Sequence, residues 1–216
     1  EFAAMGPAEF LSLLKMEFPS LAEIVVGENF TFGKDRAGNR GTLPSLSAAL
    51  GLRAHLVPHV EHGGAPVSST RIRAAVAAGD LPLANTLLGR AFALAGAVVR
   101  GRAVGRSLGF PTANVRPDLP IRPAPGIYAA RLVLPDGAPP GAAFVPDPAD
   151  PAQAHFGKVV EIHVPGFARD LYGQRVEIAF TRRLRGHMHF ADAAAAAVQI
   201  GRDVQAALAA DAEDNP

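Results

Sequence analysis

The sequence changes character near residue 91, and this change limits the folds that the chain can adopt. Up to that point helical and strand-like segments alternate, which is typical of an α/β layer with a parallel sheet. The expected segments there are helices over 7–16, 43–50 and 81–88, a helix that begins at 68–70 and ends near 78, and strands over 24–26 and 54–60.

After residue 91, short β-type runs are separated by Gly and Pro, which predicts an antiparallel barrel or sandwich. These runs cover 97–99, 127–134, 142–145, 159–164 and 175–180, and a last helix is expected over about 191–208. We therefore predict two domains, residues 1–90 and residues 91–216.

Charge and composition exclude several classes of protein. The 21 Lys and Arg residues balance the 20 Asp and Glu residues without any run of like charges, which argues against a nucleic-acid-binding surface. No apolar run approaches the ~20 residues that a membrane-spanning helix needs. Cysteine is absent, which excludes thiolate metal sites and cysteine nucleophiles, and no secretory signal is visible. We expect a cytoplasmic protein that acts on small molecules, and we leave self-association open.

The segment GRAVGRSLGFPTAN, residues 101–114, is the most informative stretch for function. Its glycines, Gly101, Gly105 and Gly109, lie four residues apart, and glycine allows the close backbone approach with which a loop can wrap a polyphosphate. Arg102 and Arg106 lie between the glycines and could add positive charge. The glycines alone would equally suit a β-hairpin turn.

The end of this segment adds two oxygen-bearing side chains. Thr112 and Asn114 lie two residues apart, and their hydroxyl and amide oxygens are hard donors of the kind that Mg²⁺ prefers. Alternatively, both side chains could cap the backbone of a turn.

The pattern GxxxGxxxGFPTAN resembles the signature of the riboflavin kinase family, and further blocks at 126–129, 159–174 and 184–190 resemble that family in the same order. The resemblance covers about residues 87–208. It implies an antiparallel β-barrel followed by a C-terminal helix. It also implies an enzyme that phosphorylates riboflavin to FMN with ATP and Mg²⁺. The alternative is a flavin- or nucleotide-binding module that has lost catalysis.

The resemblance also implies roles for particular residues. The glycine loop, with Gly101, Gly105, Arg106 and Gly109, would cover the ATP phosphates, and Thr112 and Asn114 would hold Mg²⁺. Glu161 matches the catalytic base of the family, and the residues expected to close over the flavin are Arg185, Met188 and Phe190.

Strand alternation independently suits Glu161 for a site. In a strand, Val160 and Ile162 share one face, while Glu161 and His163 share the other. If the apolar face is the core, Glu161 points away from it; without the neighbouring motifs, it would be interpreted as a solvated surface carboxylate.

Two features depart from the family pattern. Residues 141–157 replace a Gly-x-x-Pro-Thr turn with a loop rich in Asp, Pro and Ala, and His187 stands where the family usually has Glu. Both departures lie close to where substrates are expected to bind.

The first ninety residues resemble the FMN adenylyltransferase module of bacterial bifunctional FAD synthetases, in two blocks at 27–33 and 67–73. We predict a partial Rossmann-like nucleotidyltransferase domain. Within it, the expected remnant of a phosphate site consists of Ser68, Ser69, Thr70, Arg71 and Arg73. These residues lie at the start of a predicted helix, where an anion such as phosphate binds favourably. Alternatively, they could form a plain N-cap with surface arginines.

The His-x-Gly-His motif of that module is missing, and Asn29 replaces its usual Asp. We therefore expect an N-terminally truncated chain that does not make FAD, whereas an intact parent protein would.

Overall fold

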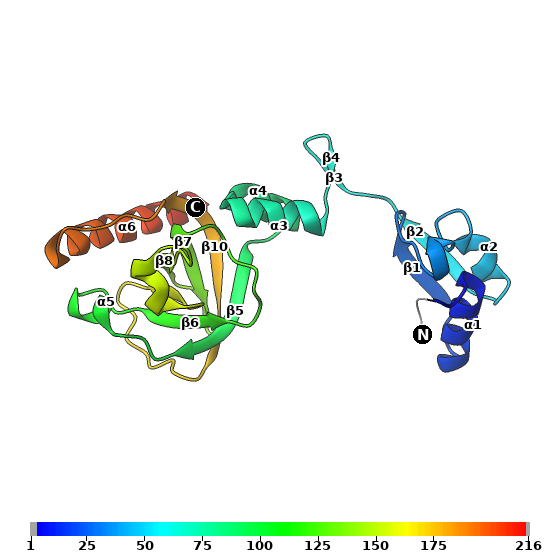
Figure 1. Ribbon diagram of the computed structural model, residues 1–216, viewed down its shortest axis with the longest axis horizontal. Helices are drawn as coiled ribbons and strands as arrows, with labels where there is room; N and C mark the ends of the chain where they lie inside the picture. Colours follow the sequence, from blue (N-terminus) through cyan, green and yellow to red (C-terminus); the bar gives the residue numbers. More distant parts are fainter. Residues whose placement is uncertain (1–3, 215–216) are drawn as a thin grey trace. The chain divides into compact units, whose positions relative to one another are not determined.

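The computed structural model describes residues 4–214 and divides the chain into two compact units, Glu1–Val67 and Ser68–Pro216 (Figure 1). Among the described residues, no helix is both long and apolar enough to cross a membrane.

The first unit is a small α/β layer, as the alternating pattern predicted. Strands β1 (Glu23–Gly27) and β2 (Arg53–Val57) pair in parallel. The sheet packs through Ile24 and Val26 against a core that includes Leu11 of α1 and Leu43 of α2. The other elements are α1 (Pro7–Glu17), η2 (Lys34–Arg36), α2 (Leu43–Ala48) and the short pair β3 (Glu61–His62) and β4 (Ala65–Pro66).

We expect the first unit to open locally more often than the second. Its parallel sheet has only two strands, and Val25 and Val57 on the face opposite the core are exposed. Two-stranded sheets are marginally stable, and regions with few buried apolar contacts exchange amide hydrogens fastest. Hydrogen exchange should therefore be faster in β1 and β2 than in the central strands of the second unit. Equal protection in both units would contradict this expectation.

The second unit begins with two helices, of which the second packs on strands of the barrel and the first packs mainly on the second. These are α3 (Ser69–Ala78) and α4 (Leu81–Leu88). The side chain of Ser68 caps α3 by accepting a hydrogen bond from the backbone N–H of Arg71, and the side chain of Asp80 caps α4 by accepting one from the backbone N–H of Leu83. Asn85 of α4 donates to the carbonyl of Phe180 and accepts from the backbone of Phe92. The sequence pattern grouped both helices with the first domain. A helical period reveals a buried face but does not identify the element that covers it.

Six antiparallel strands close into a barrel in the order β10-β5-β6-β9-β8-β7, which confirms the predicted barrel (Figure 1). The barrel is filled by side chains such as Tyr128, Ile162 and Phe180, as expected for a small barrel. The strands are β5 (Phe92–Val99), β6 (Ala113–Pro117), β7 (Gly126–Val133), β8 (Pro140–Val145), β9 (Val160–His163) and β10 (Arg175–Arg185).

Strand β6 was not predicted. Its sequence, ANVRP, contains Asn and Pro, which are depleted in strands, and it becomes a strand because it lies between β5 and β9. The two short helices α5 (Val104–Ser107) and η3 (Pro151–Phe156) also lie in segments that were expected to be loops.

The long helix α6 (Ala193–Asp214) lies against the outer face of β7, β8 and β10 (Figure 1). Small side chains, Ala207 and Ala210 of the helix and Ala129 of β7, allow close packing. Arg131 of β7 holds the end of the helix with two hydrogen bonds to Asp211, of 2.6 and 2.7 Å. The helix and the barrel wall thus border a cavity.

Candidate active site

One row of cross-strand neighbours lines the outer wall of the barrel. Asn114 of β6 lies opposite Glu161 of β9, which lies opposite Phe144 of β8. The row continues through Ile127 of β7 to Arg185 of β10. Because partners in an antiparallel sheet point to the same side, the strand register brings residues up to 71 positions apart in the chain to a single surface.

A cavity of about 670 Å³ lies over this wall. Its size is within the ~300–1,000 Å³ range of sites for small molecules. Four segments complete it: the glycine-rich loop, the stretch from η3 to the start of β9, the segment before α6, and α6 itself. The lining residues are Arg100, Gly101, Arg102, Val104, Gly105, Leu108, Phe110, Thr112, Asn114, Ile127, Ala142, Phe144, Phe156, Val159, Glu161, His163, Arg185, His187, Met188, Phe190, Ala196, Ile200, Asp203 and Val204.

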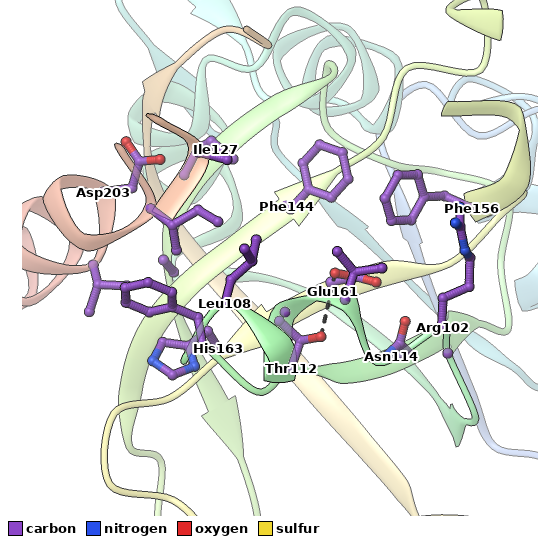
Figure 2. Close-up of a pocket in the computed structure, with 18 of the residues that line it drawn as sticks. Arg102, Leu108, Thr112, Asn114, Ile127, Phe144, Phe156, Glu161, His163 and Asp203 are labelled. Carbon is purple, nitrogen blue, oxygen red and sulfur yellow. Dashed lines mark hydrogen bonds between the residues drawn. The ribbon is translucent and has the colours of Figure 1, made fainter. Parts of the chain in front are cut away.

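Glu161 faces this cavity, as the alternation of β9 predicted. Val160 and Ile162 are buried inside the barrel, whereas the Glu161 carboxylate accepts a hydrogen bond of 3.4 Å from the hydroxyl of Thr112. Figure 2 shows Thr112 and Asn114 beside Glu161. Burial raises the pKa of Glu161 above its usual range, and the hydrogen bond from Thr112 opposes that shift in part. The site therefore brings together a hydroxyl, an amide and a carboxyl group with enhanced basicity.

His163 occupies the same face of β9 and is held in one orientation. Its Nδ1 lies 2.7 Å from the carbonyl oxygen of Pro111, and its ring contacts the ring of Phe110 edge-on. A carbonyl oxygen can only accept, so Nδ1 carries the proton. In the neutral ring, Nε2 is then the acceptor. The contact also fixes the chain just before Thr112.

The glycine-rich loop contributes only part of what was predicted. Gly101 and Gly105 line the cavity, but Gly109 and Arg106 are not among its lining residues, whereas Arg102 is. Val104–Ser107 forms the short helix α5, in which Val104 and Gly105 line the cavity and Arg106 is exposed to solvent. Gly101 packs directly on Asn114, since a Cβ there would lie 2.4 Å from its side-chain oxygen.

The predicted flavin-side residues Arg185, Met188 and Phe190 all line the cavity. The guanidinium of Arg185, however, is bound to the carboxylate of Asp203 on α6, with Nε–Oδ1 and Nη2–Oδ2 distances of 2.8 and 2.6 Å. Arg185 therefore fastens α6 to the barrel and forms a side of the cavity.

The predicted phosphate site at 68–73 is separate from this cavity. Ser68 caps α3, Ser69 and Thr70 are exposed, and Arg73 donates to the hydroxyl of Thr70 over 3.3 Å. Neither these residues nor Arg71 line the cavity.

The family model for riboflavin kinase matches residues 88–210, more than half of the chain. The chain belongs to the riboflavin kinase family. A second family model, for FAD synthetase, matches residues 1–71. The riboflavin kinase match contains the whole cavity, and the FAD synthetase match includes Ser68–Arg71 but not Arg73.

Relatives that combine both kinds of domain match most of the chain. The bifunctional riboflavin kinase/FMN adenylyltransferases of Pseudomonas fluorescens and Escherichia coli K12 are 35% and 34% identical to it and cover 95% and 94% of it. The chain spans 66% and 64% of these relatives. A crystal structure of a protein named as a macrolide-efflux protein from Streptococcus pneumoniae matches with a TM-score of 0.79 and 28% identity, over 94% of this chain and 64% of that one.

Much of the apolar lining of the cavity was not predicted from the sequence. Ile127 and Phe144 lie on the outward face of their strands, and Ile200 and Val204 lie on α6. A signal was available, because a group of apolar residues on the outer face of a barrel favours a cover by another element. It could indicate a covered outer face, but not which element covers it.

Proposed function

We propose that this chain transfers the γ-phosphoryl group of ATP to the 5′-hydroxyl of riboflavin, which yields FMN and ADP. The observation that carries the proposal is the position of Glu161, beside Thr112 and Asn114 on the wall of one cavity. A partly buried carboxyl group next to oxygen donors is a candidate functional group on physical grounds.

In this mechanism Glu161 accepts the proton of the riboflavin hydroxyl as the oxygen attacks the γ-phosphorus. Phosphoryl transfer depends mainly on positioning and on charge neutralisation, so one carboxylate is sufficient as the base. The raised pKa favours proton acceptance, because burial makes the neutral carboxyl group relatively more stable.

The side chains around Glu161 suit a magnesium ion. The hydroxyl of Thr112, the amide oxygen of Asn114 and the carboxylate of Glu161 are hard oxygen donors, and Mg²⁺ prefers a few such ligands together with water. Thr112 and Asn114 would hold the ion, which would neutralise charge on the phosphates of ATP.

Two groups of lining residues suit the two substrates. The backbone of Gly101 and Gly105 and the side chain of Arg102 line the cavity and would bind phosphates. The planar flavin ring would pack against the aromatic and thioether side chains of Phe144, Phe156, Met188 and Phe190.

The direct test is incubation of the purified chain with riboflavin, ATP and Mg²⁺, with flavins separated by chromatography and detected by fluorescence. FMN should accumulate with turnover. Tight flavin binding by folded protein without FMN formation would instead support the binding-module alternative, which the altered 141–157 loop and His187 favour. We expect this chain to form no FAD in the assay, because its 216 residues do not include the His-x-Gly-His motif of the adenylyltransferase module.

The rate of phosphorylation should rise with pH through the pKa of Glu161. Only the ionised carboxylate accepts a proton, and burial raises this pKa, so the acidic limb should lie above the range of an ordinary carboxyl group. The measurement is the pH profile of kcat/KM, because that ratio reports the pKa of groups in the free protein. An acidic limb at the usual carboxyl pKa would contradict the assignment.

Thr112→Val should raise the Mg²⁺ concentration needed for half-maximal activity, by about tenfold if one ligand is lost. Valine keeps the shape of threonine but lacks the oxygen donor. Thr112→Ser is the matched control, because it keeps the hydroxyl and should stay close to the parent. Equal Mg²⁺ dependence of the valine and serine variants would show that the hydroxyl is not a ligand.

A further inference from the structure

The two segments that depart from the family pattern meet in space. Asp150 belongs to the altered 141–157 loop, and its Oδ2 lies 3.7 Å from Nδ1 of His187 and 3.6 Å from Nε2 of His189. Ligand atoms of all three residues lie within 4.8 Å of one another. Residues about 40 positions apart thus place two imidazoles and a carboxylate around one point.

These separations are too long for direct hydrogen bonds. They are close to what a shared ion requires, because ligand atoms about 2.0 Å from a tetrahedral Zn²⁺ lie about 3.3 Å from one another. Small side-chain movements would close the difference.

The carboxylate of Asp150 is oriented by its own loop. The side-chain amide of Gln153 donates to Oδ2 over 2.6 Å, and the backbone of Ala152 donates to Oδ1 over 2.9 Å. Gln153 is only 4% exposed, and its oxygen accepts a hydrogen bond of 2.8 Å from the backbone of Asp147. Outer hydrogen bonds of this kind hold metal-binding carboxylates in place in known sites.

The histidine rings are also positioned by packing. His187 lies against Phe144, with ring centroids 5.9 Å apart, and contacts His189 edge-on at 5.1 Å. Phe144 in turn packs edge-on against Phe156 of the altered loop. His189 is exposed, which leaves an entry path for an ion from solvent.

We propose that Asp150, His187 and His189 form a binding site for a divalent transition-metal ion of the Zn²⁺ type, distinct from the Mg²⁺ site. Two imidazoles and one carboxylate are the ligands of one class of three-residue zinc site, in which water fills the fourth position. A site with two imidazole ligands binds Mg²⁺ poorly, because Mg²⁺ prefers oxygen ligands. The ion would link the altered loop to the segment that carries Met188 and Phe190, at the edge of the cavity.

The site is tested without substrates, so the result does not depend on the proposed phosphoryl transfer. Untagged full chain, stripped with a chelator, is titrated with Zn²⁺ in a calorimeter and with Co²⁺ in an absorption spectrometer. We expect saturable binding of one ion per chain. His187→Ala, His189→Ala and Asp150→Asn should each weaken the affinity at least about tenfold.

His55→Ala is the matched control, since His55 lies in β2 outside the cluster, and its affinity should be that of the parent. Circular dichroism of the metal-free variants checks that each one is folded. With Zn²⁺ bound, amide exchange should slow at 147–157 and 186–190. Absence of saturable binding, or equal affinity of the parent and the three cluster variants, would overturn the proposal.

Discussion

Glu161→Gln is expected to lower kcat for riboflavin phosphorylation by about 10²–10⁴-fold, the usual contribution of a positioned general base. Glutamine keeps the size of the side chain and an oxygen that can accept the hydrogen bond from Thr112. It cannot accept the proton of the riboflavin hydroxyl. ATP binding should change little, because in the proposed mechanism the phosphates are bound mainly by the glycine-rich loop and by Thr112 and Asn114.

The measurement is steady-state FMN formation together with a separate nucleotide-binding titration. Glu177→Gln is the matched control, because Glu177 is an exposed carboxylate on β10 outside the cavity. If Glu161→Gln keeps a kcat within a few-fold of the parent, Glu161 is not the base. A comparable loss in the Glu177 variant would indicate a general effect of removing a carboxylate.

Asp203→Ala is expected to lower the free energy of unfolding by about 3–5 kcal/mol, as for other buried ion pairs that lose one partner. The side chains of Arg185 and Asp203 are only 19% and 7% exposed. Removal of the carboxylate leaves the Arg185 charge without its partner at the interface between α6 and the barrel. Because both residues also line the cavity, flavin affinity should fall in the same variant.

Urea unfolding followed by tyrosine fluorescence suits this measurement, because the only two tyrosines, Tyr128 and Tyr172, lie in the second unit. Glu213→Ala is the control on the same helix. Its carboxylate bonds to Arg182 at 2.9 Å but is 65% exposed, so its loss should cost at most about 1 kcal/mol. Similar destabilisation by both variants would mean that burial does not distinguish the two pairs.

The sequence by itself determined the type of each domain and indicated the polar side chains expected at the candidate site. The alternation of Val160, Glu161 and Ile162 was enough to predict that the carboxylate points away from the core, because strand periodicity is local. The spacing of the glycines, Thr112 and Asn114 indicated the family. Short β-type runs separated by Gly and Pro predicted the barrel, although they did not reveal β6.

Only the tertiary structure decided which residues share a surface. The row from Asn114 to Arg185 depends on strand register, which is set by pairing between distant segments. The pairing of Arg185 with Asp203 depends on how α6 docks on the barrel, and the hydrogen bond from Asn85 to Phe180 depends on how α4 docks there.

The two departures from the family pattern illustrate the same limit. The sequence located one at 141–157 and the other at His187, but it could not indicate that Asp150 lies beside His187 and His189. Local patterns record which way a side chain points, because that depends on the period of its own helix or strand. They do not record what it meets, because loop paths and long-range packing are properties of the whole fold.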